Sequence, residues 1–531
     1  MANYWKYFSL RATPQSQPIQ GTVKNSAGGY AFPVDDWTRL DRFLILGSEG
    51  GSYYATARKL TIENAESVIR CLQADGQRTV ARIVEVSEAG RAPKNDPAIF
   101  ALALAASASE DATRSAAMTA IPKVCRTGTH LFQFVEAVEA HRGWGRALRR
   151  GVAGWYTARS VEHLALQVVK YRQRGGWSHR DILRLAHPLT DEMTRRAVFD
   201  WVCRGTGNEA LPPLVHAFEA AAKAETAEAI AGLIAEHNLP REAIPTEWLN
   251  EPRVWEALLA RMPMTALVRN LGKLSAVGVL KPLGEHVAQV TSALGDVERI
   301  RKARVHPLAL LLALKTYAQG HGDKGALTWT PVPQVIDALN AAFYTAFANV
   351  EATGRRILLA LDVSGSMALG RIAGTSLTPR EASAAMALMT AATEEHTHIV
   401  GFTSKSSGRY EPALAPLAIT PSMRLDQAVS AVSSLPFGGT DCALPMLYAL
   451  EKGISADAFV VYTDSETWAG KIHPVQALRQ YREKTGIAAK LVVVGMVSNG
   501  FSIAAPTDAG MLDVVGFDAA APAVIADFIR G

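Results

Sequence analysis

The spacing of apolar residues changes once along this chain, close to Gly354. From about residue 35 to residue 350, apolar residues recur at helical spacing in successive segments, separated by short Gly, Pro or polar breaks. After Gly354, short apolar segments typical of strands alternate with helical ones. One fold cannot satisfy both patterns, so we expect two kinds of domain.

The length of 531 residues also argues against a single hydrophobic core, because such cores stop growing at roughly 250 to 300 residues. We predict an all-helical domain over residues 1–355 and an α/β domain over residues 356–531. No stretch of the first domain alternates convincingly like a strand, and helices joined by short links are typical of HEAT-like or armadillo-like α-solenoids. Examples of the predicted helices are residues 52–74, 97–107, 110–121, 130–140, 159–174, 179–186, 213–223, 225–236, 253–261, 264–271 and 306–317.

The second domain is predicted to be a doubly wound, Rossmann-like α/β fold, because its strands and helices alternate and such connections give a parallel sheet. A capping box with proline at the first helical position, Thr378-Pro379-Arg380-Glu381, begins a helix over residues 380–392. The stretch before it is therefore a loop, and Asp362 ends a strand. The predicted strands cover residues 356–363, 397–402, 457–463 and 490–496.

The composition indicates a soluble globular protein, which we expect in the cytoplasm. Hydrophobic residues make up 48% and charged residues 20% of the chain, with no long apolar run and no basic start followed by an apolar stretch. The cysteines lie far apart in the sequence, so we expect them to be reduced rather than joined in disulfides or bound to zinc. They are Cys71, Cys125, Cys203 and Cys442.

Positive charge is concentrated in one part of the helical domain. The chain carries a net charge of +5, whereas residues 356–531 hold 13 Lys and Arg against 16 Asp and Glu, so residues 1–355 carry +8. Residues 123–184 account for all of that excess, with 12 basic against 4 acidic side chains. Focused positive charge favours binding of polyanions such as nucleic acids, although a charged stretch can also be no more than a solvated face.

Carboxylate and hydroxyl side chains gather in three segments of the α/β domain. Asp362-Val363-Ser364-Gly365-Ser366 follows an apolar strand, Gly438-Gly439-Thr440 lies in a loop, and Thr463-Asp464 follows another strand. Parallel sheets place ligands at the carboxyl edge of their strands. An all-oxygen set of two carboxylates and three hydroxyls suits a hard divalent cation, Mg²⁺ above all but also Ca²⁺ or Mn²⁺, and leaves a position open for a ligand carboxylate. The predicted metal ligands are Asp362, Ser364, Ser366, Thr440 and Asp464.

Two other interpretations of this motif are weaker. Asp and Ser often do no more than cap a turn, but three loops in the right order on a sheet of the right class argue against that alternative. A catalytic role lacks support, because Ser364 and Ser366 lie outside a G-x-S-x-G elbow and no His accompanies them. Cys442 is expected to be a small buried residue. We therefore expect no enzyme activity.

A second constellation lies inside the basic window, from Val169 to Asp181. Lys170 and Arg174 are four residues apart, so we place both on one face of a helix that ends at Gly175-Gly176. The next helix begins at Ser178. This corner would present cations to phosphates, with aromatic and imidazole rings beside them for stacking or sugar contacts. The residues predicted to contact RNA at this corner are Lys170, Arg172, Arg174, His179, Arg180 and His187.

Longer motifs from both domains resemble the Ro autoantigen family, also called the Ro/SS-A or TROVE-domain family. They include Cys125–Phe132, Gly143–Arg149, Met262–Lys273 and Gly439–Met446, and the resemblance extends over about residues 25–531. The DxSxS segment at Asp362 is similar to the metal-ion-dependent adhesion site of von Willebrand factor A (vWA) domains. In that family the serines and threonine touch the metal, whereas the aspartates act directly or through water.

The resemblance implies a ring of HEAT-like repeats closed by the vWA domain. It implies that small structured Y RNAs bind the outer surface and that single-stranded 3′ ends of misfolded RNAs thread a central hole, in RNA quality control or processing. The outer-surface positions that match the family are Lys170, Arg174 and His187. For the hole, the candidates are Arg126, His130, Arg269 and Lys273. Short loops and the lack of a long basic tail favour a compact, bacterial, cytoplasmic member.

The leading hypothesis is a monomeric, non-catalytic ribonucleoprotein scaffold that presents RNA to a separate exoribonuclease. The alternative is a protein-binding adhesion or assembly scaffold whose metal grips a partner's carboxylate. The basic window favours RNA, because a scaffold for proteins alone does not need a net +8 within residues 123–184. A metal-dependent hydrolase is a third hypothesis, but no base that could activate water is visible beside the motif.

Overall fold

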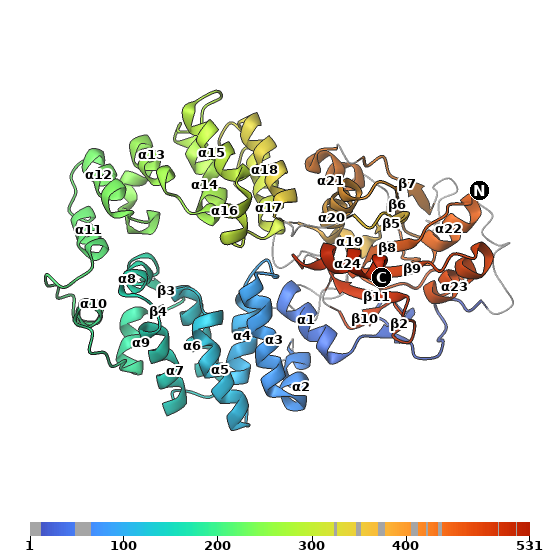
Figure 1. Ribbon diagram of the computed structural model, residues 1–531, viewed down its shortest axis with the longest axis horizontal. Helices are drawn as coiled ribbons and strands as arrows, with labels where there is room; N and C mark the ends of the chain where they lie inside the picture. The colour runs from blue at the N-terminus through green and yellow to red at the C-terminus, as the bar shows by residue number, and fades with distance from the viewer. Residues whose placement is uncertain are drawn as a thin grey trace.

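The computed structural model describes residues 12–47, 65–322, 326–346, 352–369, 377–404, 413–420, 423–433, 438–497, 499–516 and 518–531. Its helices form a ring whose two ends both meet an α/β domain, which also contains the C-terminus (Figure 1). The sequence pattern predicts the two kinds of domain, and the family resemblance implies the ring. In the described ranges, no helix is long and apolar enough to cross a lipid bilayer.

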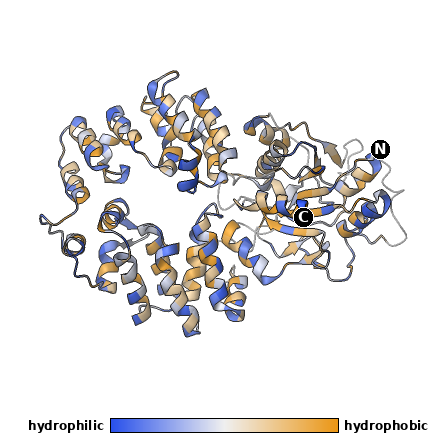
Figure 2. Ribbon diagram, viewed as in Figure 1, coloured by the Kyte–Doolittle hydropathy of each residue, from blue (hydrophilic) through white to orange (hydrophobic). Residues whose placement is uncertain are grey.

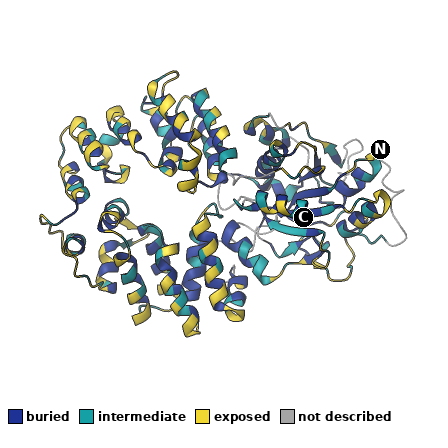
Figure 3. Ribbon diagram, viewed as in Figure 1, coloured by how far each residue is buried: buried dark blue, intermediate teal, exposed yellow. Residues whose placement is uncertain are grey.

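The ring is built from successive helices that pack on their neighbours one and two places along the chain, as α4 does on α5 and α6. Helix α4 is apolar around most of its circumference, and its neighbours bury it on all sides (Figures 2 and 3). The helices of the ring are α1 (Asp36–Leu46), α2 (Glu66–Ala74), α3 (Gly76–Ala89), α4 (Asp96–Ala106), α5 (Asp111–Val124), α6 (Gly128–His141), α7 (Arg146–Thr157), α8 (Val161–Lys170), α9 (His179–Ala186), α10 (Met193–Arg204), α11 (Pro213–Ala221), α12 (Ala227–His237), α13 (Pro252–Ala260), α14 (Met264–Ala276), α15 (Glu285–Gly295), α16 (Val297–Lys302), α17 (Pro307–Ala318) and α18 (Pro333–Thr345), with two 3-10 turns, η3 (Arg241–Ala243) and η4 (Thr246–Asn250).

The α/β domain contains a six-stranded sheet in the order β11-β9-β8-β5-β6-β7. All neighbouring pairs are parallel except the edge pair of β6 with β7. The strands are β5 (Ile357–Asp362), β6 (Thr397–Phe402), β7 (Leu414–Pro416), β8 (Ala458–Thr463), β9 (Lys490–Gly495) and β11 (Met511–Val515). The helices are α19 (Gly365–Leu369), α20 (Pro379–Thr393), α21 (Leu425–Ser433), α22 (Leu444–Lys452), α23 (Pro474–Thr485) and α24 (Ala521–Arg530).

Both faces of this sheet are covered, which explains why its strands are apolar without alternation (Figure 3). Leu359 and Leu361 point to a core that includes α20 and runs on into the helical ring. Leu358 and Ala360 point to a second core, which α22 and α23 cover. Asp362 therefore ends a strand in a fully buried central position.

Residues 12–34 belong to the α/β domain in space, although they come first in the chain (Figure 1). Strand β2 (Tyr30–Pro33) pairs with β1 (Val23–Lys24) and with β10 (Phe501–Ser502) in a small antiparallel sheet. The predicted helical domain over residues 1–355 thus includes a segment that packs elsewhere. The expectation that this domain lacks strands is also wrong, because these strands are too short to show alternation.

The corner between α8 and α9 is a hairpin and not the end of a long helix. Helix α8 ends at Lys170, and β3 (Gln173–Arg174) pairs with β4 (Trp177–Ser178) across Gly175 and Gly176. Both glycines have positive φ, 58° and 86°, which this tight turn requires. The predicted helix over residues 159–174 is therefore too long, and Lys170 and Arg174 do not share a helical face. The capping box from Ser178 to Asp181 at the start of α9 is present as predicted.

The predicted succession of helices from about residue 35 to 350 also includes α1, α3, α7, α10, α15 and α18, for which the sequence pattern gives no individual bounds. The first predicted helix, 52–74, is present from Glu66 onward as α2, and residues 52–64 lie outside the described residues.

Candidate metal site and nucleic-acid interface

Asp362 lies at the carboxyl end of β5, where the loops after three strands meet. Its carboxylate accepts a hydrogen bond from the Ser364 backbone N–H (2.9 Å) and one from the Thr463 hydroxyl (2.6 Å). The neighbouring loop is attached through the Gly365 N–H, which donates to the Gly438 carbonyl (3.3 Å). Asp362 thus caps the turn through the Ser364 N–H and also lies where the loops converge. Its capping of a turn therefore does not exclude a role in binding.

The other predicted ligands lie around the same point. The hydroxyl oxygens of Ser364 and Ser366 are 3.1 Å apart. Burial, and then the nearby Asp464 carboxylate, raise the pKa of Asp362 to about 7. Burial also raises the pKa of Asp464, and the neighbouring Ser366 hydroxyl opposes that rise. Thr440 is only 3% exposed, two residues after the Gly438 carbonyl. The structure therefore brings the five predicted ligands to one edge of the sheet.

The donor set fits a hard divalent cation. One carboxylate oxygen of Asp464, Oδ2, is buried and has no hydrogen-bond partner within the described part of the chain, whereas Oδ1 accepts from the Glu466 N–H (3.0 Å). Burying such an oxygen is costly unless a cation or a donor meets it. In the described ranges no three His, Cys, Asp or Glu side chains converge, so hydroxyls would complete the coordination. Metal binding itself stays a prediction.

Two further residues hold this site in shape, and the motif does not reveal them. Arg380 is 4% exposed, and its guanidinium donates to the carbonyl of Val363 and, at 3.4 Å, to that of Ser364. Thr463 bonds the Asp362 carboxylate from the adjacent strand. The only sequence signal for Arg380 is its place in the capping box after Thr378.

On the helical ring, the predicted corner presents exposed cations. Arg172, Arg174 and Arg180 are exposed, and Lys170 is half-buried with its ammonium 5.5 Å from the centre of the Tyr171 ring. The Arg172 guanidinium lies 5.1 Å from the Phe218 ring. Within the described part of the chain, these four side chains form no ion pair with an acid. They are available to an anionic ligand.

A second group of cations adjoins this corner, in the turn before α7 and on α7 itself. The hairpin packs against α6, and Trp177 lies 6.4 Å from Trp144 of the α6–α7 turn, measured between ring centres. This group is exposed and, among the described residues, has no acidic partner. The motifs alone do not assign it to the site, although its i, i+3 and i+4 spacing is a signal of a shared helical face. The group consists of Arg142, Arg146, Arg149 and Arg150.

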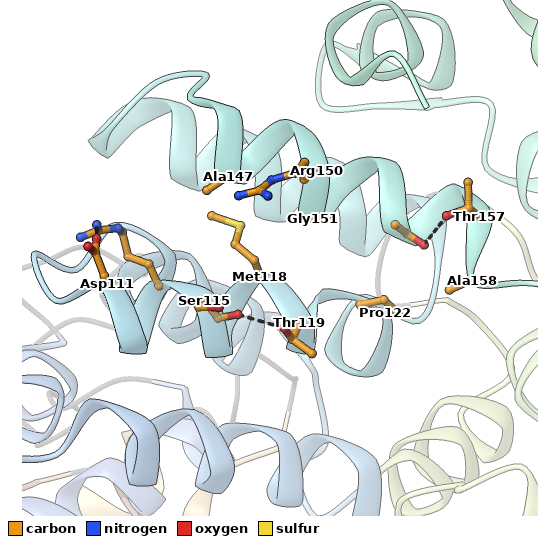
Figure 4. Close-up of a pocket in the computed structure, with 12 residues that line it drawn as sticks. Asp111, Ser115, Met118, Thr119, Pro122, Ala147, Arg150, Gly151, Thr157 and Ala158 are labelled. Atoms are coloured by element: carbon orange, nitrogen blue, oxygen red, sulfur yellow. Dashed lines mark hydrogen bonds and ion pairs between the residues drawn. The ribbon is translucent and has the colours of Figure 1, made fainter. Parts of the chain in front are cut away.

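A groove of about 710 Å³ runs between α5 and α7 beside these arginines (Figure 4). Arg150 extends over it, next to Met118 and Gly151. Arg114 also lines it but is paired with Asp111 on its own helix. The groove therefore offers one guanidinium, that of Arg150, which has no acidic partner among the described residues.

His179 is a core residue, so the expectation that it contacts RNA is corrected. The side chain is 2% exposed, its Nδ1 lies 2.7 Å from the Tyr156 hydroxyl, and its ring centre lies 4.8 Å from that of Phe132. Burial lowers the pKa of His179 to about 3. His187 differs, because it is exposed at the opposite end of α9 with a φ of 47°.

The four residues predicted for the hole lie on two opposite arms of the ring. Arg126, between α5 and α6, and His130, on α6, belong to the first arm. Arg269 and Lys273, on α14, belong to the second arm (Figure 1). The Arg126 guanidinium is half-buried and donates to the Ser87 hydroxyl (2.9 Å). Burial, and then Arg126, lower the pKa of His130 to about 4. On the other arm Arg269 is exposed, and the Lys273 ammonium donates to Asn250 (2.8 Å). The positive charges thus come from both arms, although Arg126 and Lys273 are partly committed to local bonds.

The two arms approach each other near these residues. Burial, and then Arg304, lower the pKa of Arg126, although Arg304 belongs to the turn between α16 and α17. Burial and Glu242 raise the pKa of Tyr171, and Arg269 opposes them. Residues of both arms therefore share one electrostatic environment.

Comparisons with known proteins agree with this architecture. Residues 23–229 and 236–316 match the TROVE domain family, and residues 356–529 match the Ro60 vWA domain family. The RNA-binding protein RO60 of Deinococcus radiodurans is 45% identical over 538 residues, which cover 100% of both chains. The chain belongs to the Ro60 family. The RNA-binding protein RO60 of Caenorhabditis elegans is 38% identical over 592 residues, covering 96% of this chain and 90% of its own.

The crystal structure of the Deinococcus radiodurans RO (RSR) protein superposes on this chain with a TM-score of 0.70. At 45% identity, the alignment covers 94% of this chain and 100% of that one. The resemblance to the Ro family and the predicted fold class are therefore confirmed. Ro60 relatives are named as RNA-binding proteins and not as enzymes.

Proposed function

We propose that this member of the Ro60 family is a non-catalytic protein that binds RNA. The observation that carries the proposal is a group of exposed cations from α7 and from the hairpin after α8, none of which has an acidic partner in the part of the chain that the structure describes. The contact of Trp144 with Trp177 places the two sets of cations side by side. Unpaired guanidinium groups bind phosphates through charge-assisted, often bidentate hydrogen bonds. The names of the relatives support the same ligand.

The finer parts of the proposal follow from the arrangement of these cations. We propose that small structured RNAs, Y RNA among them, bind at this exposed surface. Single-stranded 3′ ends of misfolded RNA would contact Arg126, Arg269 and Lys273 between the two arms. The protein would then act as a monomer in RNA quality control and hand RNA to a separate exoribonuclease. The cytoplasm is the proposed compartment, because the four cysteines are unpaired.

Fluorescence anisotropy with a labelled RNA hairpin and a labelled single strand tests these assignments. Lys170→Ala combined with Arg174→Ala is expected to weaken hairpin binding by about tenfold, roughly 1.4 kcal/mol, because two phosphate contacts are lost. A matched control combines Lys452→Ala with Arg479→Ala, which removes two exposed positive charges from the α/β domain. Equal hairpin affinity of both double variants would contradict the proposed surface.

A second function is favoured by the unsatisfied Asp464 oxygen. We propose that Ser364, Ser366 and Thr440, with the two aspartates, hold a divalent cation, most favourably Mg²⁺. When bound, such a cation supplies a coordination position for a carboxylate of a protein partner. Calorimetric titration of Mg²⁺ and Mn²⁺ is expected to show binding to the wild type and none to Asp362→Ala. RNA affinity should hardly change, since the proposed RNA surface lies on the helical ring.

A further inference from the structure

Gln15 is a fully buried amide that lies between the loops of the metal site. It is 0% exposed, and its Nε2 donates to the Asp441 carboxylate (2.7 Å) and to the Ile472 carbonyl (2.9 Å). Its Oε1 accepts from the Thr467 hydroxyl (2.5 Å) and from the Gly470 N–H (3.1 Å). All the hydrogen-bonding capacity of the amide is thus spent on two loops from the opposite end of the chain.

These two loops carry two of the proposed ligands. Asp441 follows Thr440 directly, and Thr467 comes three residues after Asp464. The Thr467 hydroxyl also accepts from the Cys442 N–H (3.1 Å), so Gln15 reaches both loops through one network. A Cβ on Gly470 would collide with the Gln15 amide and with Asp441, which shows how closely the loop is drawn in.

The N-terminal part of the chain holds the Asp464 loop from a second side. Arg42, on α1, is 1% exposed and donates to the side-chain oxygen (3.1 Å) and the carbonyl (2.7 Å) of Asn499. The Asn499 amide in turn donates to the Asp464 backbone carbonyl (2.6 Å). The loop that carries the distal aspartate is therefore fixed by Gln15 on one side and by the pair of Arg42 with Asn499 on the other.

Helix α1 also belongs to the helical ring. It packs against α2 and α4 of the ring and against β11 of the sheet. Residues 12–46 therefore connect the loops of the metal site with the first repeats of the ring. Side chains that orient metal ligands commonly change metal affinity about 10-fold to 100-fold when they are removed.

We propose that the N-terminal segment, through Gln15 and through Arg42 with Asn499, positions the loop that carries Asp464 and thereby sets the divalent-metal affinity of the vWA domain. The inference rests on the metal site proposed above. Gln15 does not reach the metal position itself and acts as a positioning residue.

The test uses the full-length protein and calorimetric titration with Mg²⁺ and Mn²⁺. Gln15→Met keeps the side-chain volume but removes all four side-chain hydrogen bonds. We expect it to raise the dissociation constant for Mg²⁺ at least about tenfold. Gln17→Ala is the matched control, because Gln17 lies in the same segment with an exposed side chain. Its dissociation constant should equal that of the wild type.

Hydrogen exchange and unfolding of the metal-free proteins separate positioning from simple stabilisation. In Gln15→Met, exchange should become faster in residues 464–470. If the variant unfolds at a lower temperature but binds Mg²⁺ like the wild type, Gln15 is only structural and the inference is wrong. If Gln15→Met does not fold, the same titration is made with Asn499→Ala. We expect its dissociation constant for Mg²⁺ to rise as well, and an unchanged value would overturn the inference. A wild type that binds neither ion overturns both the metal site and this inference.

Discussion

The guanidinium of Arg91 clamps the carboxylate of Asp518, with Nε 3.0 Å from Oδ2 and 3.1 Å from Oδ1. Arg91 lies between α3 and α4, whereas Asp518 lies just before α24. The Arg91 carbonyl meets His306 Nε2 (3.0 Å), at the start of α17, and accepts from the Ala519 N–H (3.3 Å). The first arm of the ring, its second arm and the vWA domain therefore meet at Arg91.

The first prediction follows from the burial of this ion pair, whose side chains are 16% and 7% exposed. Asp518→Ala leaves the Arg91 guanidinium with only the exposed Glu85 carboxylate (3.3 Å), and the loss of the buried partner of such a pair is strongly destabilising. We expect the free energy of unfolding to fall by about 2 to 4 kcal/mol. Calorimetry should show the lower transition temperature, and small-angle scattering should show a larger radius of gyration if the junction closes the ring.

An exposed ion pair provides the control for this prediction. Arg253 pairs with Glu228, and their side chains are 60% and 64% exposed. Arg253→Ala should cost no more than about 1 kcal/mol, because water screens such pairs. If Asp518→Ala proves as mild as Arg253→Ala, the junction does not stabilise the ring.

The second prediction concerns acid stability and rests on His179. Its pKa is lowered by burial to about 3, whereas an unfolded histidine titrates near 6.5. Between these values the unfolded state binds a proton that the folded state does not, so stability falls as the pH decreases below about 6.5. The loss approaches about 1.4 kcal/mol per pH unit, or roughly 2 kcal/mol at pH 5.

Replacing His179 removes this contribution. His179→Gln should lower stability at pH 7.5, because the contact with Tyr156 changes, but its unfolding temperature should depend less on pH between 7.5 and 5 than that of the wild type. His216→Gln, at an exposed position on α11, serves as the control. Parallel pH profiles for His179→Gln and the wild type would show that His179 titrates alike in the folded and unfolded protein, which would contradict the lowered pKa.

Much of the fold could be predicted from the sequence because its signals are local. Apolar runs ending at Asp362 and Thr463 predict the central strands, and the capping boxes at Ser178 and Thr378 predict two helix starts. The hairpin at Gly175 gives no such signal, because two residues per strand are too few for a periodic pattern. The strands within residues 23–33 are equally hidden, because β2 pairs with β10 near the other end of the chain and no local pattern reveals that pairing.

The candidate sites divide in the same way. The oxygen ligands around Asp362 could be found because each follows a strand or lies in a loop of a parallel sheet. Gln15 gives no signal, since its role depends entirely on tertiary contacts. The prediction for His179 is wrong because a polar residue in a basic window looks exposed, whereas its ring packs between Phe132 and Trp155.

The last prediction concerns salt, and it tests the charge argument directly. Each phosphate that a cation neutralises contributes about −0.9 to the slope of log K against log salt for a duplex and about −0.7 for a single strand. Binding of an RNA hairpin to the wild type should therefore weaken steeply between low and physiological salt. Arg146→Ala combined with Arg149→Ala should make the slope less negative by about 1.4 to 1.8, because both side chains are exposed and unpaired among the described residues.

The comparison of slopes separates phosphate contacts from other effects of these substitutions. The double variant of Lys452 and Arg479 removes the same charge from the α/β domain, so its slope should match that of the wild type. A loss of affinity with an unchanged slope would mean that Arg146 and Arg149 shape the surface without touching phosphates. A nearly flat slope for the wild type would mean that stacking or apolar contacts dominate, and the assignment of RNA to the basic surface of α7 and the hairpin would then be wrong.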